Sequence, residues 1–125
     1  MFRRYFALGA LNLGLAVALG AFGSHVLEGR LSADMLSVYE TGNRYHFYHS
    51  LGLLAVALAA DKTGDAAAMR WAGRLLTVGL VLFSGSLYVL SLSGLKGLGA
   101  IAPFGGFSFV AGWLCAAKAV LSKKI

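Results

Sequence analysis

Charged residues are scarce in this sequence. Asp, Glu, Lys and Arg together make up 13% of its 125 residues, whereas 58% of the residues are hydrophobic. Soluble domains carry about 25% charged and about 45–50% apolar residues. So few charged side chains could not cover the apolar surface of a water-soluble fold. The imbalance predicts a protein whose solvent is lipid, and we expect the lipid bilayer to be its main partner.

Cysteine and acidic residues are also few. Cys115 is the one cysteine, which excludes an intrachain disulfide and a thiolate metal cluster. The five acidic residues are outnumbered by eleven basic ones, giving a net charge of +6. These basic residues flank apolar runs and form no basic stripe with interleaved aromatic rings, so we expect no nucleic-acid partner. Their positions are typical of charges that meet lipid headgroups.

Long uncharged runs are what the sequence has instead. Residues 5–22, 75–95 and 98–117 contain no Asp, Glu, Lys or Arg. Each run is close to the roughly 20 apolar residues that a transmembrane helix needs. A fourth run, residues 45–60, is shorter and contains His46, His49 and Ser50. These runs predict four helices.

The second helix should begin well before its apolar run. Ser32 suits the N-cap, and Asp34 in the first turn suits the helix dipole. A helix over residues 33–60 would be about 42 Å long, whereas the hydrocarbon core is only about 30 Å thick. Its polar N-terminal half should therefore extend beyond the membrane on the outer side. We predict one all-α domain, residues 1–125: a four-transmembrane-helix bundle.

The basic residues are unevenly divided between the two ends of this bundle. Eight belong to the N-terminus, the second loop and the C-terminal end, and three belong to the other side. Because cytoplasmic loops are rich in Lys and Arg, both termini should lie in the cytoplasm. The eight are Arg3, Arg4, Lys62, Arg70, Arg74, Lys118, Lys123 and Lys124, and the three are Arg30, Arg44 and Lys96.

Each predicted helix carries small or polar residues at helical spacing. Such stripes let helices approach closely in lipid and form hydrogen bonds between them. The positions that we expect to pack are Gly9, Gly20, Gly23, Ser84, Gly105 and Gly112, and Asn12 and Tyr88 fall on the same stripes. The polar cluster that we expect to hold the bundle together, or to bind a ligand, comprises His25, Asn43, His46, His49 and Ser50.

Three histidines suggest an alternative. His46 and His49 lie three residues apart on one helix face, and His25 ends the first helix on the same side of the membrane. Because imidazole is a common zinc and copper ligand, these three side chains could form a metal or small-ligand site at the outer end. The structural interpretation is that they hydrogen-bond across helices, and we expect His49 to pair with His25, Asn43 or a carbonyl near Gly23.

The sequence has no complete signature of catalysis. It contains no His-x-x-x-His with a catalytic Glu, no Gly-x-Ser-x-Gly, and no Asp or Glu inside an apolar run. We therefore expect no enzyme activity and no cofactor, and predict an accessory or structural membrane protein. Glycine stripes also serve contacts between chains. Further hypotheses are therefore self-association, binding to other membrane proteins, and a role as a subunit of an oligomeric channel or transporter.

Four ordered strings carry a family resemblance. They are Gly-Ala-Phe-Gly-Ser-His at residues 20–25, Tyr-His-Phe-Tyr-His-Ser-Leu at 45–51, Leu-Phe-Ser-Gly-Ser-Leu-Tyr at 82–88, and Ala-Pro-Phe-Gly-Gly at 102–106, followed by Ala-Gly-Trp at 111–113. Together they resemble a family of small bacterial inner-membrane proteins known as a domain of unknown function, which has small eukaryotic transmembrane relatives. The resemblance covers nearly the whole chain.

The resemblance implies four helices and an inner-membrane location, but no activity. His25 and His49 match the two histidines of the family pattern. Ser24 departs from it, because the pattern has Ala there, and this small-for-small change leaves the resemblance intact. His46 stands where the family often has Gln or another polar residue, which makes it the weaker member of any site.

Overall fold

The computed structural model describes residues 1–63 and 65–122, and within them it is helical without any strand. The all-α class is therefore confirmed. Lys123 and Lys124, which entered the charge count, lie outside the described residues. In chain order the elements are α1 (Phe2–Phe22), η1 (Gly23–Leu27), α2 (Ala33–Ala59), α3 (Ala66–Gly79), η2 (Leu80–Gly85), α4 (Ser86–Ser93), η3 (Lys96–Ala100) and α5 (Ala102–Leu121).

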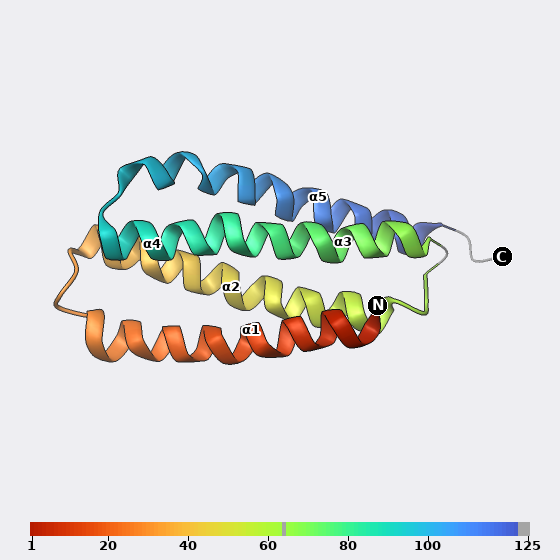
Figure 1. The fold of residues 1–125 in the computed structure, drawn as a ribbon, viewed down its shortest axis with the longest axis horizontal. Coiled ribbons are helices and arrows are strands. Elements are labelled where there is room, and N and C mark those ends of the chain that lie inside the picture. Colours follow the sequence, from red (N-terminus) through yellow and green to blue (C-terminus); the bar gives the residue numbers. More distant parts are fainter. Residues whose placement is uncertain (64, 123–125) are drawn as a thin grey trace.

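The elements form four rods that lie side by side along their length (Figure 1). The first rod is α1 with the wide π-helical turn η1, the second is α2, the third is α3–η2–α4, and the fourth is α5 with η3 at its start. The second rod packs against both the first and the third, and α5 packs against α3 and η2. The described part of α5 ends at the end of the bundle where α1 begins.

Three of the rods are long and apolar enough to cross a membrane. They are Phe2–Leu27, Ala66–Ser93 and Lys96–Leu121. Helix α2 has 27 residues and is the longest uninterrupted α-helix, but it is not among these candidates. The reason is compositional, since Asn43 and Arg44 directly precede its apolar half and His46 and His49 lie inside it, and all four lower its mean hydropathy.

The two helix starts differ in how well the sequence predicts them. Helix α2 begins as expected, with the Ser32 hydroxyl accepting a hydrogen bond of 3.1 Å from the Met35 amide. Helix α3 begins well before the uncharged run that starts at residue 75. Arg70 and Arg74 precede that run but belong to the helix. Its N-cap is Asp65, whose carboxylate accepts a 3.0 Å hydrogen bond from the Ala68 amide.

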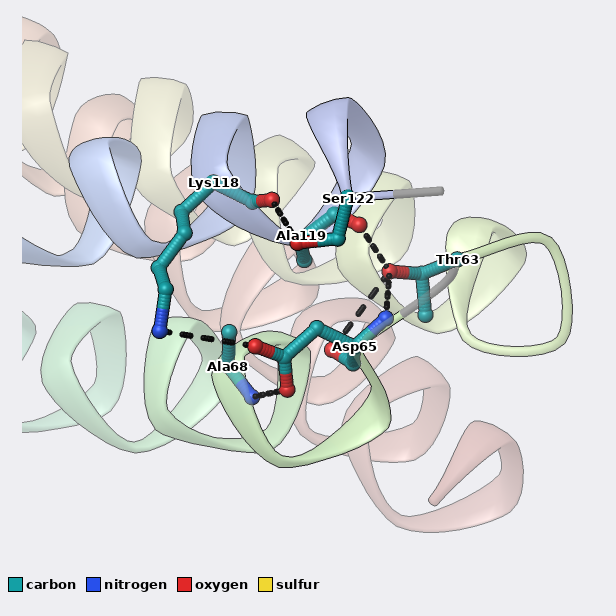
Figure 2. A network of polar contacts seen from close by, with 6 residues as sticks. All are labelled: Thr63, Asp65, Ala68, Lys118, Ala119 and Ser122. Atoms are coloured by element: carbon teal, nitrogen blue, oxygen red, sulfur yellow. Dashed lines mark hydrogen bonds and ion pairs between the residues drawn. The ribbon is translucent and has the colours of Figure 1, made fainter. Parts of the chain in front are cut away.

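A polar network ties the loop before α3 to the end of α5 (Figure 2). The Thr63 hydroxyl donates to the Ala119 carbonyl at 2.6 Å and accepts from the Asp65 amide at 3.1 Å. Lys118 Nζ lies 3.5 Å from Asp65 Oδ2. The hydrogen bond from Ala68, and with it the Lys118 ammonium, holds the pKa of the Asp65 carboxyl below its ordinary value. The network therefore closes one end of the bundle.

Helix α5 approaches the backbone of the third rod closely at Gly105. A Cβ built on Gly105 would lie 2.7 Å from the Leu82 carbonyl carbon and against the Phe83 amide. Both contacts are with backbone, which cannot move aside as a flexible side chain could. The next residue, Gly106, has only the Phe83 ring nearby, at 3.9 Å. Substitutions at Gly105 and Gly106 can thus distinguish the effect of close packing from the effect of helix propensity.

Gly105→Ala should push α5 away from η2 and destabilise the fold by about 1–3 kcal/mol, the usual cost of overpacking. Gly106→Ala is the matched control, and it should be neutral or stabilise by up to about 1 kcal/mol, because Ala has less backbone freedom to lose. Thermal unfolding in detergent measures both. Equal effects of the two substitutions would contradict the close contact at Gly105.

Candidate functional site

A chain of polar side chains crosses the interior of the bundle, with His46 at its centre. His46 is 3% exposed and uses both ring nitrogens. Its Nε2 lies 2.9 Å from Asn12 Oδ1 on α1, and its Nδ1 lies 2.9 Å from the Tyr88 hydroxyl on α4. Asn12 in turn donates from Nδ2 to the Leu8 carbonyl at 2.9 Å. One imidazole on α2 thus connects three rods.

The chemistry of these groups fixes the direction of each hydrogen bond. Since Asn12 Oδ1 can only accept, the proton of His46 must be on Nε2. A neutral ring then accepts at Nδ1, so the Tyr88 hydroxyl donates to it. The same hydroxyl accepts a 3.0 Å bond from Asn43 Nδ2. The bonds therefore run one way, from Asn43 through Tyr88 and His46 to Asn12, and neighbouring bonds in such chains strengthen one another.

Two further bonds attach α1 to α2 through backbone carbonyls. Asn43 Nδ2 also donates to the Ala16 carbonyl at 2.9 Å. The Tyr39 hydroxyl donates to the Leu19 carbonyl at 2.5 Å, and its ring packs on that of Tyr88 with centroids 5.2 Å apart. These carbonyls already belong to the helical ladder of α1, so the added bonds use their second lone pairs.

Glycines on α1 make room for these side chains. A Cβ at Gly20 would lie 3.0 Å from Asn43 Oδ1, and one at Gly23 would lie 2.6 Å from the Tyr39 ring. At the other end of α1, a Cβ at Gly9 would meet the backbone of α2, 2.8 Å from the Ser50 carbonyl oxygen. The structure thus places these three glycines, expected as packing positions, on the face toward α2. Gly112 of α5 lies likewise against Leu76 of α3.

His49 does not join this chain. Its Nδ1 donates to the Tyr45 carbonyl of its own helix at 2.9 Å, and its ring stacks on Phe109 of α5 with centroids 3.5 Å apart. The expected pairing with His25, Asn43 or a carbonyl near Gly23 was therefore wrong. At 3.6 residues per turn, His49 lies about 120° around α2 from Asn43, which turns it toward α5.

The three histidines of the metal hypothesis point to different surroundings. His25 is exposed on η1, and its side chain forms no hydrogen bond with the described residues. His46 has both nitrogens engaged, and His49 stacks against α5. Within residues 1–63 and 65–122, no three His, Cys, Asp or Glu side chains gather as a ligand set. The structure does not bring the three imidazoles together, and His46, the expected weaker member, is the best connected.

Two buried serines take no part in the network. Ser50 and Ser84 are almost completely buried, and neither Oγ atom has a hydrogen-bond partner among the described residues. Ser84 lines a small pocket of about 160 Å³ together with Asn12, His46 and Tyr88. The predicted polar cluster leaves out Asn12, Tyr39 and Tyr88, although Asn12 and Tyr88 fall on predicted stripes and Tyr39 lies on the same arc of the second helix as His46. Their spacing was the available signal.

Comparison with known proteins identifies the family. The family described as "Protein of unknown function (DUF423)" matches residues 19–106. The chain belongs to the DUF423 family. The matched segment contains Asn43, His46 and Tyr88 of the network, and the resemblance found in the sequence is confirmed.

The curated relatives are membrane proteins of similar length. The UPF0382 membrane protein YwdK of Bacillus subtilis is 50% identical over 110 residues, which cover 88% of this chain and 89% of YwdK. A UPF0382 membrane protein of Staphylococcus saprophyticus is 49% identical over 110 residues, 88% of this chain and 90% of the relative. One of Staphylococcus epidermidis is 48% identical over 117 residues, 94% of each chain. No solved structure matches. This DUF423 chain is thus a small membrane protein of a family without an assigned activity.

Tyr88→Phe should destabilise the bundle by about 1–3 kcal/mol, because it leaves His46 Nδ1 without a donor in a buried place and removes one of the two acceptors of Asn43 Nδ2. The matched control is Tyr48→Phe on α2, which removes the same atom from a side chain that is 54% exposed and should change little. Thermal unfolding of the purified proteins in one detergent compares them. Indistinguishable melting temperatures for the two variants would contradict the role given to the Tyr88 hydroxyl.

Proposed function

We propose that this protein is a non-enzymatic accessory protein of the bacterial inner (plasma) membrane. It crosses the membrane four times, with both termini in the cytoplasm, and binds other membrane proteins or a second copy of itself. The observation that carries the proposal is the network around His46. Its side chains use their hydrogen-bonding groups on one another and on α1 carbonyls, which is what a structural role requires.

The outward faces of the bundle support a role in association. Leu11 of α1 is 73% exposed, and Phe107 of α5 is equally exposed. These side chains lie on the two outermost rods, which each have a side without a neighbour in the bundle. Large aromatic side chains are favourable anchors at protein interfaces. Lipid or a partner helix would cover these faces.

The course of the chain supports four crossings. Helix α1 and the α3–α4 rod run in the same direction along the bundle (Figure 1). If both cross the membrane, the chain must return between them, and α2 is the element that makes this return. Of the side chains that lower the hydropathy of α2, His46 and His49 are buried in the bundle and do not meet lipid, whereas Arg44 is exposed in the polar half of the helix.

The distribution of charge supports the orientation. Five basic residues lie at the end of the bundle where α1 begins and α5 ends, near the starts or ends of their helices. They are Arg3, Arg4, Arg70, Arg74 and Lys118. Cytoplasmic ends of membrane proteins are rich in Lys and Arg. This end is therefore the cytoplasmic one in our proposal.

Cysteine labelling on intact cells tests the topology. In a Cys115→Ala background, Arg30→Cys should react with an impermeant maleimide from outside, whereas Ser122→Cys should react only after lysis. Both positions lie in the described part of the chain and outside the regular helices. The reverse pattern would invert the orientation. Labelling of both cysteines from outside would mean an even number of crossings between residues 30 and 122, and so an odd number in all if α1 crosses.

Site-specific photo-crosslinking tests the role. A photoreactive residue at Leu11 or Phe107 should give a discrete adduct, reproducibly identified as one membrane protein or as a second copy of this chain. The same residue in place of the fully buried Leu53 should react only within the chain. A purified protein that forms no adduct at either outer position, yet turns over a lipid or solute, would contradict the proposal.

A further inference from the structure

Four arginines line one groove between the beginnings of α1 and α3. Arg3 and Arg4 come from the first turn of α1, and Arg70 and Arg74 lie one turn apart on α3. The groove has a volume of about 320 Å³ and is also lined by Tyr5. Each guanidinium presents five N–H donors and no acceptor. The groove is thus strongly positive and suited to an anion.

The fold holds the two arginine pairs together through Tyr5. The Tyr5 side chain is buried, and its hydroxyl donates to the Arg70 carbonyl at 3.2 Å. Its ring lies against α3 at Gly73, where a Cβ would be only 2.5 Å from the ring. The side chain therefore fixes the first turn of α1 beside the first half of α3. The proximity of the four charges follows from packing and does not depend on flexible ends meeting by chance.

No carboxylate neutralises these arginines within the part of the chain that the structure describes. There the one ion pair within 4 Å joins Lys118 to Asp65, and it involves none of the four. Among the described residues, Arg74 has the ring of Trp71 beside it, 5.1 Å from its guanidinium carbon. Like charges that converge repel one another and destabilise the folded state. An anion from outside the chain would relieve this repulsion.

We infer that the groove binds the phosphate headgroup of an anionic phospholipid, and that it prefers a headgroup with two phosphates. Arginine forks bind phosphate oxygens through paired hydrogen bonds, and four of them can serve two phosphates. The surroundings fit a lipid, because Phe2, Phe6 and Trp71 are exposed apolar side chains close to the arginines in sequence, available to the acyl chains. Basic pockets between membrane helices bind such headgroups.

Lipid retention in nanodiscs tests this inference. The full chain is placed in phosphatidylcholine nanodiscs containing a small fraction of diphosphatidylglycerol, and the bound lipid is measured by native mass spectrometry. The unmodified chain should retain diphosphatidylglycerol over phosphatidylcholine. Arg70→Gln/Arg74→Gln should lower this affinity roughly thirtyfold, from the electrostatic contribution of two arginines. Arg30→Gln/Arg44→Gln removes the same charge from the other end and should retain the lipid.

Further measurements distinguish a lipid site from the alternatives. Equal retention by the two double variants would overturn the site. Full displacement of the lipid by an equal concentration of pyrophosphate would overturn the lipid assignment in favour of a soluble anion. Circular dichroism and the melting temperature of each variant establish that it is folded. The inference takes the membrane location from the proposed function, but a nanodisc exposes both faces, so a reversed topology would leave this result unchanged.

Discussion

A polar side chain that is buried in a helix bundle has no water to bind and must find its partner within the protein. His46 meets this requirement with two hydrogen bonds, to Asn12 on α1 and to Tyr88 on α4. Because the three groups come from three rods, the positions of those rods relative to one another are set by one imidazole. Moving any rod by more than a few tenths of an ångström would lengthen these 2.9 Å bonds and leave buried polar atoms unsatisfied.

The packing on either side of this interaction follows from it. On the α1 side, Gly20 and Gly23 leave space for Asn43 and Tyr39, so that their polar groups can reach α1 carbonyls. On the α5 side, contacts between α2 and α5 are aromatic, with His49 stacked on Phe109. Helix α2 is thus joined to α1 and to the α3–α4 rod by side-chain hydrogen bonds, and to α5 by stacked rings.

The helices and the small-residue face of α1 could be predicted from the sequence. The partner of each polar side chain and the rotation of each helix about its axis could not. The cap at Ser32 and the glycine stripe on α1 follow from local patterns that carry their own physical meaning. The partner of His49 depends on how far α2 is rotated toward α5, which is decided by both helices together. The start of α3 was missed because an uncharged run marks the lipid-facing length of a helix, and helices continue into the charged interface. Hydropathy also fails for α2, since an average cannot tell a buried His46 from an exposed one.

The direction of the hydrogen bonds at His46 depends on the tautomer of its imidazole ring, and this tautomer can be observed directly. Nitrogen-15 NMR of the protein labelled in its histidine rings, in lipid or detergent and assigned with a His46→Gln variant, distinguishes a protonated ring nitrogen from an unprotonated one. We predict a proton on Nε2 of His46, donated to Asn12, and an unprotonated Nδ1 that accepts from Tyr88. A proton on Nδ1, on its own or together with one on Nε2, would contradict it.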